Sequence, residues 1–348
     1  MYYFQNDYNQ MCHPAIWKHL QKISEEPMSG YGEDPHCRTA VKLIRSKCGR
    51  EDVAVHFLVG GTQTNLTVIA AALRPHQGVI AAKSAHIHVH ETGAIEATGH
   101  KVLDLPSEDG KITAEQISKA AQEHLGDVNF EHTVQPKLVY ISQSTELGTT
   151  YTLQELEDIS FVCKKYGLYL YVDGARLGYA LSADENDVTL ADLTRLTDVF
   201  YIGGTKVGAM FGEAVVISNP SIADDFRYII KQRGGMMAKG WLLGAQFEAL
   251  FTDDLYFTIA KNANGLAKRL RETLESLGYP VVGNSKTNQI FTVLPNSALR
   301  ILQKEFAYSP WGVVDEDHTM VRFCTSWATT QFEVDALCAA LTEIAASS

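Results

Sequence analysis

The sequence predicts an α/β protein with a mostly parallel sheet that helices cover on both faces. Short runs that are apolar almost throughout alternate with helix-like runs along the first two thirds of the 348 residues. Strands without a polar face are typical of parallel sheets, because helices bury both sides of such a sheet. The alternation of strand and helix in turn favours parallel pairing, since each crossover needs a helix.

Seven strand candidates and two clear helices make up this alternating part. The strands are VAVHFLV (53–59), GVIAAK (78–83), KVLDL (101–105), KLVYIS (137–142), LYLYVD (168–173), DVFYIGG (198–204) and AVVIS (214–218). The first helix contains LTVIAAAL (66–73). The second is TLQELEDISFVCKKYG, and its last residue, Gly167, is of the type that commonly ends a helix.

The pattern changes after about Trp241. The later elements are a long helix (255–277), two strands (289–294 and 319–324) and a final helix from residue 332. Helices with few strands predict a small α+β domain. We therefore expect an N-terminal arm and a large domain over residues 1–245, and a small domain over residues 246–348.

Composition narrows the class of protein. The formal net charge is −11 and no Lys/Arg-rich run occurs, which argues against a nucleic-acid partner. No apolar run approaches the roughly 20 residues that span a bilayer, so no membrane partner is expected. The six cysteines are scattered without a C-x-x-C pair, as expected for reduced thiols. We therefore predict a cytoplasmic protein.

A glycine-rich turn, GGTQTN (60–65), opens the first helix. Backbone N–H groups at a helix N-terminus bind anions such as phosphate, and Thr62 and Thr64 would add hydroxyl donors. Taken alone, an ordinary glycine turn with a helix cap explains the motif at least as well. It is neither a Walker loop nor G-x-G-x-x-G, so a nucleotide is not indicated.

Histidines follow the second strand in SAHIHVHE (84–91). His86 and His90 would share one face of a helix, which is compatible with a metal pair. The general-base Glu of an H-E-x-x-H site is missing, and we expect no metal among the site residues. A flat side chain such as His86 would instead stack on a cofactor ring. Taken by itself, the motif favours structural histidines over either role.

Two further strands end in residues that carry chemistry. One strand ends at Asp173, three residues before Arg176, and the next ends at Gly204, two residues before Lys206. A carboxylate at a strand end keeps a pyridine nitrogen protonated, and a partly desolvated lysine is nucleophilic. Each feature alone is also compatible with a solvated turn.

Together, these four signals follow strands at the edge where open α/β sheets bind their ligands. Pyridoxal 5'-phosphate is the cofactor that needs a phosphate cradle, a stacking group, a carboxylate for its ring nitrogen and a Schiff-base lysine. We therefore predict this cofactor. A nicotinamide-binding protein is not indicated, because the glycine fingerprint after the first strand is missing.

Over nearly its whole length the sequence resembles the threonine aldolase and β-eliminating lyase family of type I pyridoxal-phosphate enzymes. The resemblance lies in FQNDY (4–8), GYGEDP (30–35), GGTQTN (60–65), VDGARL (172–177), GGTK (203–206) and VRF (321–323). It implies the type I fold with a small C-terminal domain and a small amino-acid substrate. It also implies homodimers or homotetramers with shared active sites.

The resemblance implies a role for each matching residue. These roles are phosphate binding by Gly61 and Thr62, stacking by His86, ring-nitrogen pairing by Asp173, a contact to the ring hydroxyl by Arg176, cofactor attachment at Lys206, and a carboxylate clamp at Arg322. Lys206, His86 and Asp173 would be the catalytic residues. Asn6 and Tyr31 would lie at the substrate edge, in part from a neighbouring subunit.

One departure from the family pattern concerns the substrate. Typical threonine aldolases carry Glu-Asn-Thr-His before the DGAR strand, whereas here Thr145 stands where that histidine would be. Retro-aldol cleavage of a threonine-like substrate to glycine and an aldehyde is the expected reaction. The alternative is a β-eliminating lyase that releases ammonia and a keto acid. A non-catalytic cofactor-binding protein is a third reading, which Arg322 and Lys206 together argue against.

Overall fold

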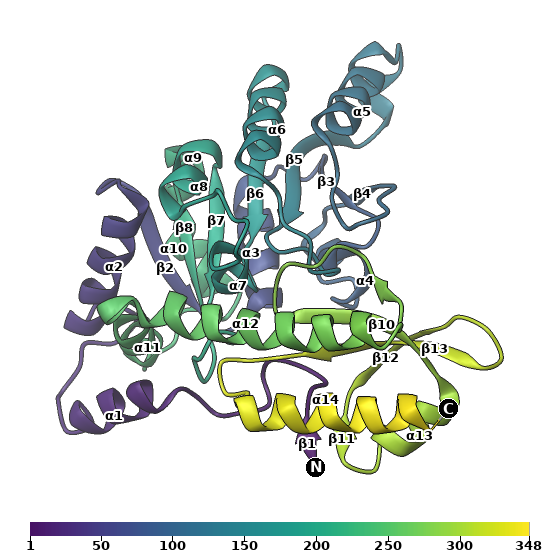
Figure 1. The fold of residues 1–348 in the computed structure, drawn as a ribbon. Coiled ribbons are helices and arrows are strands. Elements are labelled where there is room, and N and C mark those ends of the chain that lie inside the picture. Colours follow the sequence, from purple (N-terminus) through teal and green to yellow (C-terminus); the bar gives the residue numbers. More distant parts are fainter. Residues whose placement is uncertain (348) are drawn as a thin grey trace.

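A seven-stranded sheet forms the centre of the larger part of the molecule (Figure 1). The computed structural model describes residues 1–347. The strands are β2 (Ala54–Leu58), β3 (Gln77–Ala82), β4 (Val102–Leu105), β5 (Gln135–Ser142), β6 (Tyr169–Asp173), β7 (Val199–Gly203) and β8 (Glu213–Ile217), in the order β2-β8-β7-β6-β5-β3-β4. The pairs from β7 to β4 are parallel, and β8 alone runs antiparallel to both its neighbours. The predicted mostly parallel α/β sheet is confirmed, with one reversed strand.

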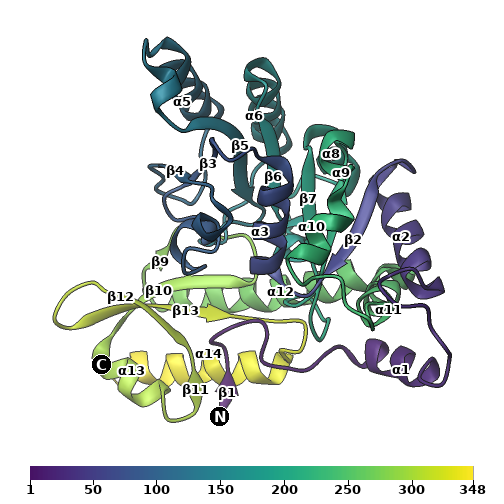
Figure 2. The ribbon, with the colours of Figure 1, turned by 180° about the vertical axis from the view of Figure 1, so that it is seen from behind.

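Helices cover both faces of this sheet, which is why its central strands are apolar along their length. In Figure 1, α6 (Leu153–Tyr166), α7 (Leu177–Leu181) and α8 (Leu190–Leu196) lie in front of the sheet. Figure 2 shows α3 (Gly61–Ala72) and α10 (Phe226–Gln232) in front when the molecule is seen from behind. Every residue of β3, β7 and β8 is buried.

The remaining helices complete the layers around the sheet and the small domain. They are α1 (Pro14–Lys22), α2 (Pro35–Cys48), α4 (His86–Val89), α5 (Ala114–Gly126), α9 (Pro220–Ala223), α11 (Trp241–Phe251), α12 (Leu255–Ser276), α13 (Asn296–Leu302) and α14 (Gln331–Ala346), with three short 3₁₀ turns at Glu96–Thr98, Phe130–His132 and Thr252–Asp254. Local sequence sets several helix ends. Thr152 and Glu155 form a capping box at the start of α6, and Gly167 ends it with a φ of 63°.

The C-terminal part holds a second, antiparallel sheet, as the small α+β domain was predicted to. Its strands are β9 (Val281–Val282), β10 (Gln289–Pro295), β12 (Ser309–Val313) and β13 (His318–Cys324), in the order β12-β13-β10-β9. The chain's first strand, β1 (Tyr2–Tyr3), pairs in parallel with β11 (Phe306–Ala307) beside this sheet. The N-terminal segment therefore starts on the small domain and crosses to α1 (Figure 2).

The helix α12 connects two separate hydrophobic cores. Its first half, up to Ala263, packs into the core of the large sheet, and its second half, from Leu266, packs into the core of the small domain. The chain therefore passes from one core to the other within α12, about 20 residues after the predicted domain boundary between residues 245 and 246. That boundary stays a prediction. Among residues 1–347, no helix is long and apolar enough to cross a membrane.

Candidate active site

A cavity of about 320 Å³ opens at the carboxyl ends of β5, β6 and β7 and at the start of α3. Six of the predicted site residues line it: Gly61, Thr62, His86, Asp173, Arg176 and Lys206. The remaining lining residues are Tyr8, Val59, Gly60, Ser142, Ser144, Glu146, Ala175, Tyr201, Thr205, Phe211 and Glu213. Its volume lies in the range of small-molecule sites, which is roughly 300–1,000 Å³.

The N-terminus of α3 faces this cavity without a side-chain cap. Gly60 occupies the cap position in extended backbone, and no side chain hydrogen-bonds to the helix start. The first N–H groups of an uncapped helix are unsatisfied and carry its positive dipole end. A Cβ on Gly61 would come 3.2 Å from the Tyr201 hydroxyl, so glycine keeps this end of the cavity open. The arrangement suits a phosphate group.

The Asp173 carboxylate is buried and accepts four hydrogen bonds. Oδ1 accepts from the Tyr201 hydroxyl at 2.6 Å and from the Ala175 N–H at 2.9 Å. Oδ2 accepts from the Tyr140 hydroxyl and from Asn65 Nδ2 at 3.2 Å. Burial, together with the Asp173 charge, raises the pKa of Tyr140 and of Tyr201 well above the usual value, so both phenols stay protonated donors. These contacts fix the orientation of the carboxylate.

Lys206 lies in the turn that follows β7 and lines the cavity. Burial lowers the pKa of this amine from its usual value, and the Arg176 charge adds to the effect, while Asp7, Asp173 and Glu213 oppose it. No hydrogen bond or ion pair holds the Lys206 Nζ within residues 1–347. The amine is therefore more often neutral than a solvated lysine and is free to react.

A buried ion pair between Arg176 and Asp7 lies beside Lys206. Arg176 donates from Nε and Nη2 to the two oxygens of Asp7, at 2.8 and 3.0 Å, and Asn288 Nδ2 donates to Asp7 at 2.9 Å. Burial alone would raise the pKa of the Asp7 carboxyl, but the charges of Arg176 and Lys206 bring it below the usual value. The pair thus ties the N-terminal segment to the cavity.

The predicted substrate-edge residue Asn6 does not line the cavity itself. Its Oδ1 accepts from the backbone N–H of Tyr8 at 3.1 Å, and Tyr8 is the member of this segment that reaches the lining. Asn6 therefore shapes the turn that presents Tyr8. A contact between Asn6 and a substrate stays a prediction.

His86 is held by an acid that the sequence analysis did not single out. Its Nδ1 lies 2.8 Å from Glu91 Oε1, which also accepts from Asn65 Nδ2 at 2.7 Å. Because Asn65 also donates to Asp173, one hydrogen-bonded chain connects His86 to the Asp173 carboxylate. The ring is 37% exposed, and its Nε2 is left for the cavity. Helix α4 is a single turn that ends before His90, whose ring centroid is 5.6 Å from that of His86.

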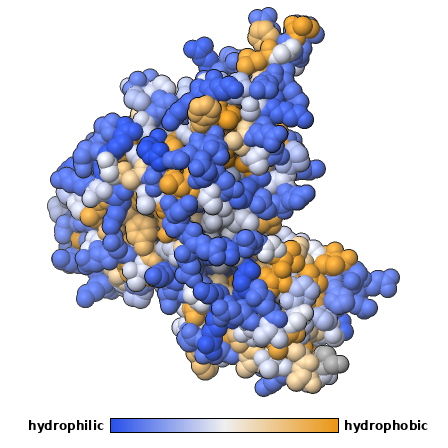
Figure 3. Space-filling view, turned by 45° about the horizontal axis from the view of Figure 1, so that its top comes forward, coloured by the Kyte–Doolittle hydropathy of each residue, from blue (hydrophilic) through white to orange (hydrophobic). Residues whose placement is uncertain are grey.

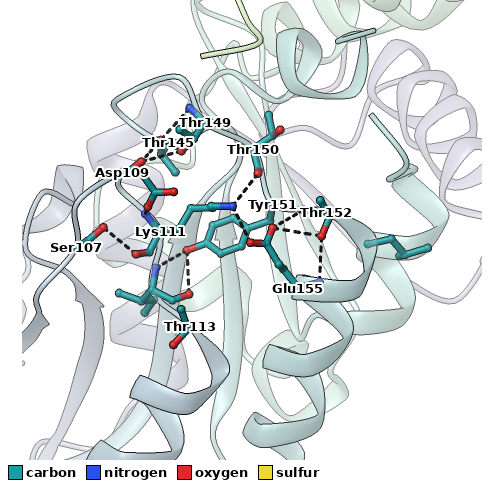
Figure 4. Close-up of polar contacts among 12 residues, drawn as sticks. Ser107, Asp109, Lys111, Thr113, Thr145, Thr149, Thr150, Tyr151, Thr152 and Glu155 are labelled. Atoms are coloured by element: carbon teal, nitrogen blue, oxygen red, sulfur yellow. Dashed lines mark hydrogen bonds and ion pairs between the residues drawn. The ribbon is translucent and has the colours of Figure 1, made fainter. Parts of the chain in front are cut away.

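Thr145 lies outside the cavity lining, although it was expected at the substrate. Its hydroxyl bonds to that of Thr149 at 2.7 Å and lies 3.4 Å from the Asp109 carbonyl, so it closes a loop (Figure 4). Its neighbours Ser144 and Glu146 line the cavity instead. Glu146 Oε1 accepts from the His86 N–H at 2.9 Å and from Ser142 Oγ at 3.0 Å. Burial raises the pKa of the Glu146 carboxyl.

Arg322 and Tyr31 also lie outside the cavity lining. Arg322 Nη1 donates to Gln289 Oε1 at 3.1 Å, Nη2 donates to the Gln5 carbonyl at 3.0 Å, and the guanidinium lies 5.1 Å from the Trp311 ring centroid. Tyr31 is 47% exposed and lines a different hollow, beside α10 and α11. Within one chain, the structure does not bring Tyr31 to Lys206.

Glu213 is a further acid in the lining, and the reversed strand β8 explains its position. Because β8 runs antiparallel, its first residue lies at the carboxyl edge of the parallel strands, opposite Gly203. Its carboxylate accepts from the Gly204 N–H at 2.9 Å and from Thr205 Oγ1 at 2.8 Å. Burial raises the pKa of Glu213 to about 7, although these donors and the Lys206 charge oppose the shift.

The fold and the cavity define an aminotransferase-like α/β protein with a lysine and an aspartate at the ligand-binding edge. Thermus thermophilus aspartate aminotransferase superposes with a TM-score of 0.72 over 99% of this chain and 91% of its own, at 16% identity, which shows the shared fold alone. The chain belongs to the Beta-eliminating lyase family, whose sequence model matches residues 13–297. This family is pyridoxal-phosphate-dependent.

Two relatives cover almost the whole chain. The low specificity L-threonine aldolase of Pseudomonas sp. (strain NCIMB 10558) is 31% identical over 339 residues, which are 96% of this chain and 95% of that protein. A solved structure of Leishmania major threonine aldolase has a TM-score of 0.97 at 47% identity, covering 99% of this chain and 100% of that one. The threonine aldolase and β-eliminating lyase kinship predicted from the sequence is thereby confirmed.

The residues present in the cavity fit pyridoxal phosphate. The uncapped start of α3 suits its phosphate, and the unpartnered amine of Lys206 suits a Schiff base with its aldehyde. Asp173 provides an oriented carboxylate for the ring nitrogen, and His86 provides a flat ring at the mouth. In addition, the Ser144 hydroxyl is buried without a partner, which leaves a donor for a ligand.

Proposed function

We propose that this protein is a pyridoxal-phosphate-dependent threonine aldolase, which cleaves L-threonine or L-allo-threonine to glycine and an aldehyde. One observation carries the proposal: the same cavity contains three features. They are the Lys206 amine, which has no hydrogen bond or ion pair within residues 1–347, the oriented Asp173 carboxylate and the uncapped N-terminus of α3. Kinship with threonine aldolases over the whole chain supports this reaction among those that the fold accommodates.

Each residue would hold one part of the cofactor. The N–H groups at Gly61 and Thr62 would bind the phosphate, Lys206 would carry the aldehyde carbon, and Asp173 would hold the proton on the ring nitrogen. When bound, pyridoxal phosphate supplies an electron sink for the charge left at Cα when a bond to that atom breaks. Because Tyr140 and Tyr201 donate to Asp173, the carboxylate is fixed in one orientation before the cofactor binds.

Retro-aldol cleavage requires a base for the β-hydroxyl proton. His86 Nε2 is our candidate, because Glu91 engages the other ring nitrogen and orients the imidazole toward the cavity. Thr145 is unsuited, since its hydroxyl is engaged by the loop around Thr149. Glu146 lines the same cavity, and burial raises the pKa of its carboxyl, so it is a second candidate for this proton.

Arg322 would bind the substrate carboxylate and so decide which bond at Cα aligns for cleavage. Its Nε is buried without a hydrogen-bond partner. A planar guanidinium grips a carboxylate through two N–H groups, and Arg322 has an unsatisfied one.

We further propose that the protein forms homodimers or homotetramers with shared active sites. Tyr31 lies exposed beside α10 and outside this chain's cavity, as expected for a residue that serves a neighbouring subunit. Large apolar side chains such as Tyr228, which is 75% exposed, also reach the surface, and Figure 3 shows hydrophobic areas that interrupt the hydrophilic face.

All six cysteines are free, which supports a cytoplasmic location.

The test is product analysis with the purified protein and added cofactor. With L-threonine or L-allo-threonine we expect equimolar glycine and acetaldehyde, and with serine or cysteine little turnover. Formation of ammonia and a keto acid without glycine would instead establish β-elimination. A protein that binds the cofactor but turns over none of these substrates would contradict both reactions.

A further inference from the structure

Three helices outside the cavity bring two histidines and a glutamate together. His19 is on α1, His36 is on α2 and Glu248 is on α11. Glu248 Oε2 lies 3.1 Å from His19 Nε2 and 2.6 Å from His36 Nδ1. All three candidate ligand atoms lie within 4.8 Å of one another. The histidines are 212 and 229 positions from Glu248, so no sequence motif announces the cluster.

This set of atoms matches the ligands of a borderline divalent metal. Imidazole nitrogen and carboxylate oxygen bind Zn²⁺ at about 2.0–2.2 Å, so the ligand atoms of a tetrahedral site stand about 3.3 Å apart. To reach this separation, the distance from Glu248 Oε2 to His19 Nε2 must lengthen from 3.1 Å by about 0.2 Å and that to His36 Nδ1 from 2.6 Å by about 0.7 Å. The side chains are 12–22% exposed, which leaves access for the metal and for water as a fourth ligand.

The surroundings of His36 support metal binding. Its Nε2 is buried and makes no hydrogen bond, and the nearest carboxylate, Glu26 Oε2, lies 3.5 Å away. Metal-bound histidines usually direct their second nitrogen at a carboxylate, which fixes the ring and strengthens the ligand. A small movement of the half-exposed Glu26 side chain completes such a contact.

We propose that His19, His36 and Glu248 bind a zinc-like divalent transition-metal ion. The site joins the N-terminal helix to the large domain and is separate from the proposed aldolase chemistry. It acts on the cavity through the start of α1, where the His13 N–H donates to the carbonyl of Gly208, two residues after Lys206, at 2.8 Å. Fixing α1 therefore also fixes the segment that carries Asp7 and Tyr8.

Zinc binding to the full-length protein with its cofactor tests this proposal. After dialysis against a chelator and addition of ZnCl₂, gel filtration and elemental analysis should find one zinc per chain, and the melting temperature should rise. His36→Gln and Glu248→Gln should each lower zinc affinity at least tenfold and remove the rise. Glu26→Gln should weaken binding about tenfold, as for a group that orients a ligand.

A matched control is His318→Gln, because His318 also pairs with a carboxylate, Asp315 at 2.9 Å, but lies on β13. It should keep the zinc and the rise in melting temperature. Should the cluster variants fail to fold, zinc-edge X-ray absorption on the unmodified protein gives a second readout, with two imidazole ligands expected. Wild-type protein without bound zinc, or variants that retain as much zinc as wild type, would overturn the proposal.

Discussion

The Tyr201 hydroxyl donates to Oδ1 of Asp173 at 2.6 Å while lining the cavity beside Gly61. One phenol therefore orients the carboxylate that would hold the ring nitrogen and also forms part of the wall that faces the cofactor. Because burial keeps the pKa of Tyr201 far above its usual value, this donor is present across the working pH range.

We expect Tyr201→Phe to lower cofactor affinity and kcat about tenfold, because Asp173 loses one of its four donors. Stability should fall by about 1 kcal/mol, the typical net value of one hydrogen bond. Tyr151→Phe is the matched control, since Tyr151 Oη bonds to the backbone of Ile112, away from the cavity. It should lose similar stability without the loss of kcat. Equal activity losses in both variants would show that Tyr201 acts only on stability.

Glu213→Gln should change how the stability of the cofactor-free protein depends on pH. The pKa of Glu213 in the folded protein, about 7, lies above its usual value of 4.5, so its stabilising contribution is fully present below pH 4.5. That contribution is lost as the pH rises through about 7, because the ionised carboxylate is buried. The difference corresponds to about 3 kcal/mol.

Urea unfolding of both proteins at about pH 5 and pH 8 measures this effect. Relative to Glu213→Gln, the wild type should lose stability between the two conditions. Parallel pH curves for the two proteins would show that Glu213 titrates as a solvated acid does.

Glu91→Gln should lower kcat about tenfold, because a neutral amide replaces the charged carboxylate that accepts from His86 Nδ1 and orients its ring. His86→Asn should lower kcat for retro-aldol cleavage about a hundredfold, and it should also weaken cofactor binding because the stacking ring is lost. If Glu91 acts only through the His86 imidazole, adding Glu91→Gln to His86→Asn should lower kcat/KM no further. Additive losses in the double variant, measured as kcat/KM for L-threonine, would contradict that single pathway.

Thr145→Val and Glu146→Gln should separate the two residues at the departure from the family pattern. Thr145→Val should destabilise the protein by about 1–2 kcal/mol, because its hydroxyl closes the loop to Thr149, and should spare kcat. Glu146→Gln should instead reduce kcat, because its carboxylate lines the cavity. A large loss of kcat in a stable, cofactor-loaded Thr145→Val protein would contradict this and would show that Thr145 acts on the substrate.

The sequence indicated the cavity residues that lie at the ends of parallel strands. It did not indicate those that tertiary contacts or a reversed strand bring to the cavity. Asp173 ends β6 and Lys206 follows the last residue of β7 by three positions, so the strand ends alone indicated that both lie at this edge. Glu213 begins β8, and its place at the same edge depends on the reversal of that strand, which hydrophobicity does not encode. Tyr201 looked like a core residue within an apolar strand, since only tertiary contacts show where its hydroxyl points.

Loop geometry explains the remaining differences. Thr145 lies between Ser144 and Glu146, and both of these neighbours line the cavity. The hydrogen bonds within the loop decide which of the three side chains faces the cavity, and the sequence does not show them. Glu91 follows His86 by five positions, and that spacing has no meaning until the single turn of α4 is known. Contacts between distant helices, as for His19 and Glu248, are likewise set only by packing.

Attachment of the cofactor to Lys206 is the central claim, and borohydride reduction of the cofactor-loaded protein tests it most directly. We expect the visible absorbance band of the Schiff base to bleach on reduction, and mass spectrometry to place the added pyridoxyl group on the peptide that contains Lys206. Lys206→Ala should show neither the band nor the labelled peptide. A label on another lysine, or no band after pyridoxal phosphate is supplied, would contradict the account.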